Sequence, residues 1–402
     1  MHLTTSNSGG AGVAAVRLAK AQQNDLRTIA RVSTPKDASS SRRGILVQKT
    51  RSIESKVLTG IQQTIAQKEV RFVSPLSVSQ LDWEHIRDFS PDILHIHNWY
   101  NFLSLEDIRQ LLQRFKVVFT SHDERLLTGG CHITFGCERY LKGCHSCPQV
   151  RFASNMIFRS ANSLQGILRE SNNYSIIAPS NWLVAKFQLS PFINPAAQIK
   201  LIPNVIPMGK YSPTARTPRL NIAFLFVTNK ANPANKGLPE VQKALEKLSR
   251  LNAGIEFQLQ IAGIESKSGL GATENYSVKY SGQLSDTELQ DLYSNSDALI
   301  VASKSENSPN VISEAQLRGA IVIAHAVGGI PELISNQETG LLYDSGKKSL
   351  YSTLQEFLEM SESDRENIRS TAFQSAKSRH ETNTILDQTY DLYVELLRRN
   401  SN

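Results

Sequence analysis

The sequence predicts an α/β protein built from two doubly wound domains, and three observations support this. Short β-like apolar runs alternate with amphipathic helical stretches along the whole chain, which favours parallel sheets with helices on both faces. At 402 residues the chain is longer than one ordinary hydrophobic core requires. The stretch NVIPMGKYSPTARTPRL (204–220) holds three prolines and little periodicity, as linkers between domains do.

In the first half of the chain, six apolar runs are expected to form strands. Four amphipathic segments between them have the residue spacing of helices. The expected strands are HLTT (2–5), RTIARV (27–32), DILHIH (92–97), KVVFTS (116–121), YSIIAPS (174–180) and IKLIP (199–203), and the expected helices are 11–21, 50–67, 104–114 and 156–170.

The second half repeats this alternation, and its stretch 305–320 has the signals of a helix. Ser308 can cap this helix, Pro309 suits its first position and Gly319 can end it. The expected strands are NIAFLFV (221–227), FQLQIAG (257–263), VKYSG (278–282), DALIVAS (297–303) and AIVIAHA (320–326).

Four segments follow from this reading. We expect a Rossmann-like domain over residues 1–205, a linker over 206–220 and a second Rossmann-like domain over 221–380, with a cleft between the domains. The amphipathic segment 381–402 is expected to form a helix that crosses back to the first domain.

Composition restricts the class of protein. The content of 40% hydrophobic and 20% charged residues is typical of soluble globular proteins, and no apolar run approaches the roughly 20 residues of a membrane span. The start, MHLTTSNSGGAG, lacks the charged and apolar regions of a secretory signal. We therefore expect a cytoplasmic protein.

The charge is distributed unevenly. Residues 1–200 carry a net charge of +10 and residues 201–402 carry −3, which together give +7. A basic half can bind nucleic acid, an anionic membrane surface or an acidic ligand, or it can reflect surface composition alone. Because no nucleic-acid motif accompanies the scattered basic residues, we expect no nucleic-acid partner and keep peripheral contact with an anionic membrane as an alternative.

Several motifs fall at the carboxyl ends of expected strands, where open α/β sheets bind ligands. Backbone amides at the turn with Gly10 and Gly12 can face a phosphate or a sugar hydroxyl, although a tight turn also explains these glycines. His122 can contact a ligand or be structural. His95 and His97 are interpreted as structural or as lining a cleft.

Two lysines lie between a strand and a helix of the second domain. In TNKANPANKGLPEVQKAL, Lys230 and Lys236 precede a helix start, and Lys236 is followed by a glycine. A lysine at this position can neutralise a diphosphate together with the helix dipole, or it can be an ordinary surface lysine.

The four cysteines of the chain lie within 17 residues, with the pattern C-x5-C-x6-C-x2-C. In a reducing cytoplasm, disulfides are not expected. The clustering and the closing C-x-x-C suit a structural zinc site, and free or redox-labile thiols are the alternative. The candidate ligands are Cys131, Cys137, Cys144 and Cys147 of the loop 126–150.

Together the motifs resemble the retaining glycosyltransferases of family four, which have the two-domain glycosyltransferase-B architecture. The matching stretches cover nearly the whole chain, from GGAGVAAVRLAKA through HIHNWY, TSHDE, APSNWL, LIPNVIP and NKGL to TGLLYD. The most specific is ENSPNVISEAQLRGAIVIAHAVGGIPELI, in which seven residues separate two glutamates. The cysteine segment looks like that of a subgroup of enzymes of surface-polysaccharide and exopolysaccharide assembly.

The resemblance implies roles for individual residues. Glu314 would bind the ribose hydroxyls of the nucleotide, and Glu306 would meet hydroxyls of the donor sugar. The amides near Asn310 and Val311, with Lys236, would face the diphosphate and stabilise the charge that grows on it. His122 matches the first-domain histidine that faces the donor sugar.

The implied reaction is a retaining, metal-independent transfer of a hexosyl group from a nucleotide sugar to a saccharide or lipid-linked acceptor. No cofactor is expected for catalysis. Many relatives carry an arginine after the first strand of the second domain, which is missing here, and Lys230 is a candidate substitute. The alternatives are a non-catalytic nucleotide- or sugar-binding scaffold, a nucleotide-sugar epimerase, or a phosphorylase of related architecture.

Overall fold

The chain divides into two compact units. The computed structural model describes residues 1–25, 32–34, 45–47, 57, 60–62, 64–66, 73–208, 221–228, 233–252, 254–265, 275–344 and 346–399. The first unit comprises Met1–Val205 and Glu381–Asn402, and the second comprises Ile206–His380. Most of the expected linker 206–220 lies outside the described residues.

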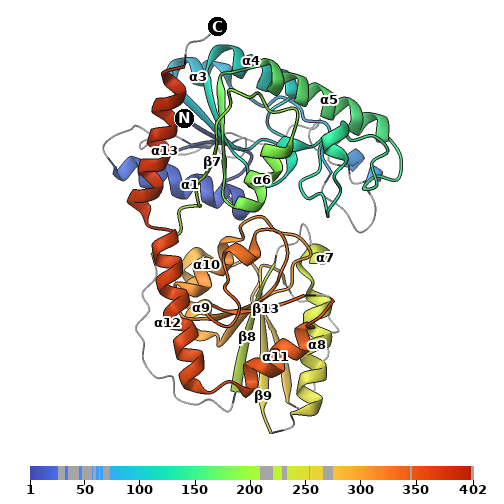
Figure 1. Ribbon diagram of the computed structural model, residues 1–402, viewed down its shortest axis with the longest axis vertical. Helices are drawn as coiled ribbons and strands as arrows, with labels where there is room; N and C mark the ends of the chain where they lie inside the picture. The colour runs from blue at the N-terminus through green and yellow to red at the C-terminus, as the bar shows by residue number, and fades with distance from the viewer. Residues whose placement is uncertain are drawn as a thin grey trace. The chain divides into compact units, whose positions relative to one another are not determined.

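Each unit contains one parallel sheet with helices packed on it (Figure 1). The first sheet has the strand order β3-β2-β1-β4-β5-β6-β7, and the second has the order β10-β9-β8-β11-β12-β13. In both sheets the strand order reverses direction beside the first strand of the unit, as in doubly wound folds. The predicted fold class is confirmed.

The described elements of the first unit follow the alternation of the sequence. Its strands are β1 (His2–Thr4), β2 (Val32–Thr34), β3 (Ile45–Val47), β4 (Ile93–Asn98), β5 (Lys116–Thr120), β6 (Tyr174–Ala178) and β7 (Ile199–Leu201). Its helices are α1 (Gly9–Asn24), α3 (Trp83–Phe89), α4 (Leu105–Arg114), η1 (Arg125–Leu127), η2 (Arg139–Lys142), α5 (Ser154–Glu170), α6 (Asn181–Leu189) and α13 (Thr382–Leu397).

The second unit is built in the same way. Its strands are β8 (Asn221–Val227), β9 (Glu256–Ala262), β10 (Tyr276–Tyr280), β11 (Ala298–Val301), β12 (Ile321–His325) and β13 (Leu341–Tyr343). Its helices are α7 (Pro233–Lys236), α8 (Leu238–Leu251), α9 (Asp286–Asn295), α10 (Asn310–Gln316), η3 (Ile330–Glu332), α11 (Leu350–Glu359) and α12 (Glu362–Arg379).

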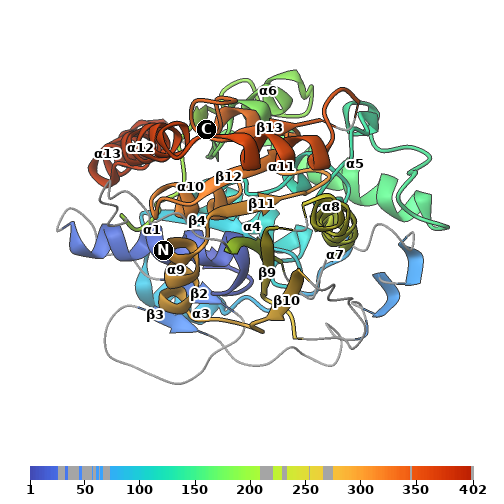
Figure 2. The ribbon, with the colours of Figure 1, turned by 90° about the horizontal axis from the view of Figure 1, so that it is seen from below.

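In the second unit, successive side chains of a strand pack alternately into two hydrophobic cores, one on each face of the sheet. In β11, Ala298 and Ile300 pack in the core with α8 and α11, whereas Leu299 and Val301 pack in the core with α9 and α10. Figure 2 shows α8 and α11 together on one side of the strands and α9 with α10 on the other. Because both faces are buried, the strands read as continuous apolar runs.

The same two-residue period decides where the histidines of the first unit lie. On β4, Leu94 and Ile96 face the core that also includes α4 and α5. Ile93 faces the opposite core, which contains residues of α1 and α13. His95 and His97 share the face of Ile93, since successive strand side chains point to opposite sides. Two histidines are thus directed towards α1 and α13.

Helix boundaries follow local capping. Ser104 caps α4 and Ser285 caps α9, and in each case the acidic residue three positions later bonds back to the cap. The prediction for 305–320 was wrong by one residue at its start: Pro309 is the N-cap rather than the first helical residue, because its ψ of 113° is extended. No side chain caps this helix, so Ser308 does not have the predicted role.

The strands at the first sheet's edge were predicted least well. Of the expected strand 27–32, only its last residue is described, and it begins β2. β3 lies within the basic stretch 39–52 and was not predicted, since three apolar residues among basic ones give too short a signal. Across the described residues, no helix is both long and apolar enough to cross a membrane.

Candidate active site

In the second unit, Lys236 and Glu306 form an ion pair at the carboxyl ends of neighbouring strands. Lys236 ends α7, which follows β8, and Glu306 lies in the loop after β11. Lys236 Nζ lies 2.5 Å from Glu306 Oε1, and Ser303 Oγ donates to the same oxygen at 2.9 Å. The side chains are only 24% and 16% exposed, so the pair is largely screened from water. The structure therefore brings two predicted site residues into contact.

Two glycines allow these loops to meet. A Cβ on Gly237, whose φ is +74°, would lie 2.2 Å from the carbonyl oxygen of Ala302 at the end of β11. A Cβ on Gly328, whose φ is +59°, would lie 1.8 Å from the carbonyl oxygen of Glu306, which also accepts from the amide of Gly329 at 3.0 Å. The glycines of NKGL and GGIPELI thus allow two backbone segments to pack closely against each other, and this packing holds Glu306 in place.

Glu314 lies on α10, about one turn after the start of this helix. Its Oε2 accepts a hydrogen bond of 3.1 Å from the hydroxyl of Tyr293, a buried residue of α9. Tyr293 was not predicted, since its partner is 21 positions away and no local pattern links them. Asn310 and Val311 begin α10, and amides at a helix start have no acceptor within the helix.

Lys230 lies outside the described residues, within the stretch 229–232 that follows β8. Lys230 as a phosphate ligand therefore stays a prediction.

In the first unit, His122 follows β5 and contributes to the wall of a small cavity. Residues of the β4 and β5 ends form this cavity, including His97, Asn98, Trp99 and Asp123. His122 Nε2 lies 3.2 Å from His97 Nδ1, and the two rings are stacked. Burial lowers the pKa of His122 to about 4, despite the opposing effect of Asp123. At neutral pH His122 is an uncharged imidazole that can accept or donate one hydrogen bond at each ring nitrogen.

His97 belongs to a group of buried histidines with His2 and His95. His2 Nδ1 lies 2.9 Å from His97 Nε2, and His2 Nε2 lies 2.7 Å from Gln22 Oε1 of α1. His95 bonds Thr120 and the hydroxyl of Tyr393, both at 2.6 Å. The interpretation of His95 and His97 as structural agrees with this burial. The sequence analysis missed Gln22 and His2. The spacing of His95 and His97, two positions apart on one face of β4, was the signal that could have indicated a group of buried histidines.

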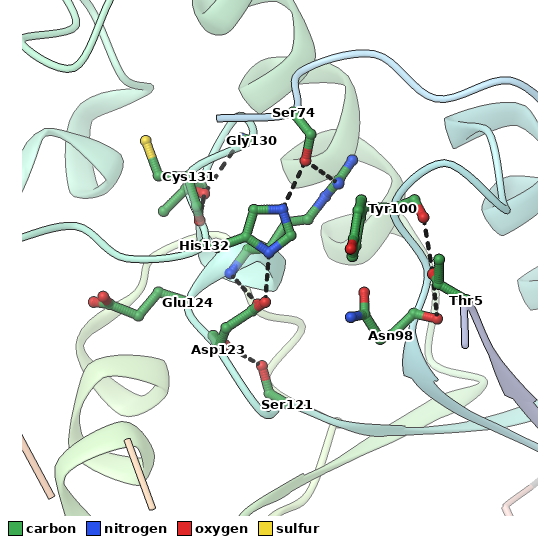
Figure 3. Close-up of polar contacts among 12 residues, drawn as sticks. Thr5, Ser74, Asn98, Tyr100, Ser121, Asp123, Glu124, Gly130, Cys131 and His132 are labelled. Carbon is green, nitrogen blue, oxygen red and sulfur yellow. Dashed lines mark hydrogen bonds and ion pairs between the residues drawn. The ribbon is translucent and has the colours of Figure 1, made fainter. Parts of the chain in front are cut away.

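The next residue, Asp123, ties the loop of His122 to the cysteine-rich loop (Figure 3). His132 Nδ1 lies 2.6 Å from Asp123 Oδ2, and His132 Nε2 lies 2.7 Å from Ser74 Oγ. Arg125 Nη1 donates to the same Ser74 oxygen at 2.6 Å. Burial raises the pKa of Asp123, but His132 and the amide of Arg125 lower it more, so this carboxyl is ionised.

This arrangement has the order of a Ser-His-Asp triad, but its surroundings do not suit a nucleophile. Ser74 is only 4% exposed, and its oxygen accepts a hydrogen bond from the Arg125 cation. An oxygen held in this way is neither accessible nor activated. We assign the group a structural role in fixing the loop that carries His132.

The glycine-rich turn of the first unit precedes α1. Gly12 is required by packing, because a Cβ there would lie 2.1 Å from the carbonyl oxygen of Ser6, whereas a Cβ on Gly10 would meet no atom within 4 Å. No side chain caps this helix at Ser8. A tight turn accounts for Gly12, and a ligand at Gly10 and Gly12 stays a prediction.

The four cysteines line a single cavity with Tyr140 and Pro148. A hydrogen bond between Cys131 and Cys147 raises the pKa of Cys131 and lowers that of Cys147 to about 6. Backbone amides also donate to Cys144 and Cys147. The structure thus gathers all four predicted metal ligands around one space.

The cysteine sulfurs are not as close as metal ligands would be. Within the described ranges, the set of three potential ligands whose atoms all lie within 4.8 Å of one another is His2, His95 and His97. Each ring nitrogen of those histidines already has a hydrogen-bond partner. Zinc at the cysteines stays a prediction.

The second unit is similar to a known protein family. Residues 222–375 match the model of the family described as glycosyl transferases group 1. The matched range lies within the second unit and covers most of it. The match begins in β8 and ends in α12, so it includes the loops of Lys236 and Glu306.

Two relatives are similar in sequence to part of the chain. Glycogen synthase of Mycobacterium tuberculosis is 24% identical over 261 residues, which are 63% of this chain and 57% of that protein. A putative colanic acid biosynthesis glycosyl transferase of Escherichia coli, WcaC, is 24% identical over 257 residues, or 59% of this chain and 60% of that protein. The matched region thus spans about three-fifths of the curated relatives.

Solved structures share the fold of both units. Sucrose-phosphate synthase from Thermosynechococcus elongatus has a TM-score of 0.69 at 17% identity, covering 98% of this chain and 94% of that chain. HepE from Anabaena, solved in complex with UDP-glucose, has a TM-score of 0.62 at 17% identity and 98% coverage of both chains. The lipopolysaccharide glycosyltransferase WaaG has a TM-score of 0.63 at 15% identity and the same coverage. The neighbours have the glycosyltransferase-B fold that the sequence predicted.

Proposed function

We propose that the chain is a retaining, metal-independent glycosyltransferase that moves a hexosyl group from a nucleotide sugar to a saccharide or lipid-linked saccharide, in polysaccharide or glycolipid biosynthesis. The observation that carries this proposal is the ion pair of Lys236 and Glu306 at the strand ends of a glycosyl transferases group 1 domain. The names of the relatives, which concern glycogen and colanic acid, and the complex of HepE with UDP-glucose support it.

The second unit offers matching groups for each part of a nucleotide sugar. Glu314 would accept hydrogen bonds from the ribose hydroxyls, and Glu306 would accept from hydroxyls of the sugar. Lys236 would face the diphosphate together with the amides of Asn310 and Val311. Before the donor binds, Lys236 and Glu306 neutralise each other, so both side chains are held near their places without a buried unpaired charge.

The reaction exchanges one bond to the anomeric carbon for another. The bond from this carbon to the phosphate oxygen breaks, and a bond to the acceptor oxygen forms on the same face of the sugar. The acceptor hydroxyl gives its proton to the leaving diphosphate, whose growing negative charge Lys236 stabilises. Neutral His122 would hydrogen-bond the sugar without taking a proton. Because no described side chain has the place of a nucleophile, the two-carboxylate route of retaining hydrolases is not proposed.

Two further features belong to this proposal. The cysteine cluster would hold one structural zinc ion, which the shared cavity and the amide donors to Cys144 and Cys147 support.

The basic first half would contact the anionic inner surface of a membrane, which its net charge of +10 supports. Cosedimentation with vesicles with and without anionic lipid tests the second point, and equal binding to both would contradict it.

A thermal-shift screen without added metal tests the donor site. The ligands are UDP, GDP, ADP and their common sugar conjugates. One nucleotide at a hundred times its dissociation constant should stabilise the chain by about 2.7 kcal/mol. Lys236→Met should remove most of this effect, since it removes the charge and keeps the length of the side chain. Lys304→Met, at an exposed lysine of the same region, is the matched control and should respond like the original chain.

Three outcomes are informative. Selective stabilisation followed by transfer to an acceptor, with the donor's anomeric configuration kept in the product, supports the proposal. Binding without transfer to any acceptor favours a nucleotide- or sugar-binding scaffold. No stabilisation by any ligand, or an undiminished effect in Lys236→Met, contradicts the assigned donor site.

A further inference from the structure

Four exposed apolar side chains of the first unit lie on segments that adjoin the cysteine-rich loop. They are Val57, Ile61, Leu76 and Phe152, and their exposed fractions are between 38% and 55%. Apolar surface in water is unfavourable, so a group of such side chains on one surface indicates a contact with another apolar phase. Figure 1 shows the segment that carries Ile61, in light blue, beside the loop.

A backbone contact brings Phe152 next to this segment. The amide of Arg151 donates to the carbonyl oxygen of Ile65 at 2.9 Å. Ile61 and Ile65 are both helical and lie one turn apart. Phe152, which directly follows Arg151, is therefore beside the turn that begins at Ile61.

Two further hydrogen bonds place Leu76 in the same region. Gln62 Nε2 donates to the carbonyl oxygen of Leu76 at 2.7 Å, so Leu76 lies close to Ile61, the residue before Gln62. Ser160 Oγ of α5 donates to the carbonyl oxygen of Pro75 at 2.7 Å, which holds this segment on α5. The four apolar side chains thus form one surface, which we call the apolar patch.

The chain around the apolar patch is basic. Arg151 precedes Phe152, and Arg159 precedes Ser160, the residue that contacts Pro75; both arginines are exposed. Residues 139–169 contain five basic residues and no acidic one, and residues 57–66 and 73–81 contain no charged residue. The charged side chains that these segments bring to the patch are therefore all cationic.

Apolar side chains with cationic neighbours suit an anionic lipid surface. The apolar groups can enter the boundary between headgroups and acyl chains, while the guanidinium groups stay at the lipid phosphates. A lipid surface requires no matching shape, whereas a stable protein interface buries roughly 800 Å² on each partner. Four partly exposed side chains supply only a fraction of such an area, so lipid is the partner that the patch fits better.

We propose that the apolar patch inserts into the headgroup region of an anionic bilayer, and that Arg151 and Arg159 bind the lipid phosphates. The surface is defined by the contacts above, whereas its use, to bring the first unit to a lipid-linked acceptor, rests on the proposed function. Membrane contact is then a property of this one surface and not of the overall positive charge of the first half.

Vesicle cosedimentation of the full chain tests the surface. The vesicles contain phosphatidylcholine with about a quarter of phosphatidylglycerol, which gives them a negative surface potential. Phe152→Ser should lower the partition coefficient about tenfold, because it removes the largest apolar group of the patch. Arg151→Gln should lower it about fivefold.

Matched controls make the same chemical changes elsewhere on the first unit. Leu189→Ser removes an apolar side chain that is also exposed, at the end of α6, and Lys20→Gln removes an exposed charge of α1. Both should bind vesicles like the original chain. Phe152→Leu, which keeps an apolar side chain, should retain most of the binding. Equal binding by Phe152→Ser and the original chain overturns the proposal.

Tryptophan fluorescence reads insertion directly. In Phe152→Trp, lipids with brominated acyl chains should quench the emission more strongly than in the original chain, because the new indole approaches the acyl chains. Leu189→Trp should show no such additional quenching. Quenching that does not increase in Phe152→Trp overturns the proposal.

Two comparisons separate the other possibilities. If the chain binds no vesicles but self-associates in light scattering, and Phe152→Ser abolishes this association, the patch is a contact between two copies and the proposal is wrong. If the vesicle results are as expected but no nucleotide sugar is bound or transferred, the docking surface stands and the proposed function fails. If a sugar is transferred to an acceptor while all variants bind vesicles equally, the function stands and the docking surface fails.

Discussion

A single carboxylate, Glu306, shows how individual contacts prepare this site. Ser303 and Lys236 both contact its Oε1, and the amide of Gly329 holds its backbone carbonyl. Each of these three partners lies at least three positions from Glu306 in the chain. The sequence was enough to select Glu306 as a site residue. The pairing of its charge with Lys236 and the fixed position of its side chain depend on three loops that meet in the folded chain.

Glu314 offers the sharpest residue-level test. Glu314→Ala should weaken binding of the nucleoside diphosphate by about tenfold to a hundredfold, because hydrogen bonds to a charged group are worth roughly 1.5–3 kcal/mol. Tyr293→Phe removes only the hydroxyl that holds this carboxylate and should cost a few-fold. Calorimetric titration gives both affinities. Glu338→Ala, at an exposed site of the same unit, is the control, and unchanged affinity in Glu314→Ala would refute the ribose assignment.

At the level of elements, the cysteine-rich loop is joined to its surroundings by buried polar contacts. Glu124 accepts from the amide and hydroxyl of Thr134 at 2.7 and 2.8 Å, and Lys186 pairs with the same buried carboxylate. His132 contacts Asp123, which directly follows His122. The order of this loop and the position of His122 are therefore linked through short contacts.

The loop gives a metal prediction. Purified protein should contain about one zinc ion per chain, because four thiolates around one cavity satisfy a tetrahedral structural site. Chelation should lower the unfolding temperature, since metal binding contributes directly to folding. Cys131→Ser should lose the metal, and Ser146→Ala, in the same loop, should keep it. A well-folded, metal-free preparation with four titratable thiols would end the zinc hypothesis.

On the scale of the whole molecule, the buried histidines predict acid lability. In the native chain the pKa of His2 is about 3, against a usual value near 6.5, and those of His95 and His97 are also lowered. Between these values the unfolded chain binds more protons, so the free energy of unfolding rises with pH. It is highest above pH 6.5 and falls below it, by roughly 2 kcal/mol at pH 5 for each histidine that stays neutral.

Denaturant unfolding at several pH values measures this dependence. His95→Gln, which keeps a polar side chain that does not titrate, should flatten the slope between pH 6.5 and 5. His85→Asn, at a partly exposed histidine of α3, should leave it nearly unchanged. A free energy of unfolding that is constant over this range would contradict the neutral, buried state of the histidines.

The sequence and the structure agree most closely where periodicity is strong. β4, β5, β6, β8 and β12 lie within one residue of the expected runs at their starts, because long apolar runs between two helical layers have one interpretation. Short elements were harder to predict from the sequence. β3 has only three residues, which lie among basic ones, and it was missed. α10 starts after Pro309 because the proline stays extended, which residue preference alone did not indicate.

The sequence by itself determined the two parallel-sheet units, the strand ends that carry His122 and Glu306, and the clustering of the cysteines. These properties follow from local periodicity and from the order of residues along the chain. Tertiary structure decided the pair of Lys236 with Glu306 and the bond of Tyr293 to Glu314. It also decided the contacts that link Gln22 to His2, His2 to His97 and His97 to His122. Their partners lie 20 to 95 positions apart, and only the folded chain brings together groups so distant in sequence.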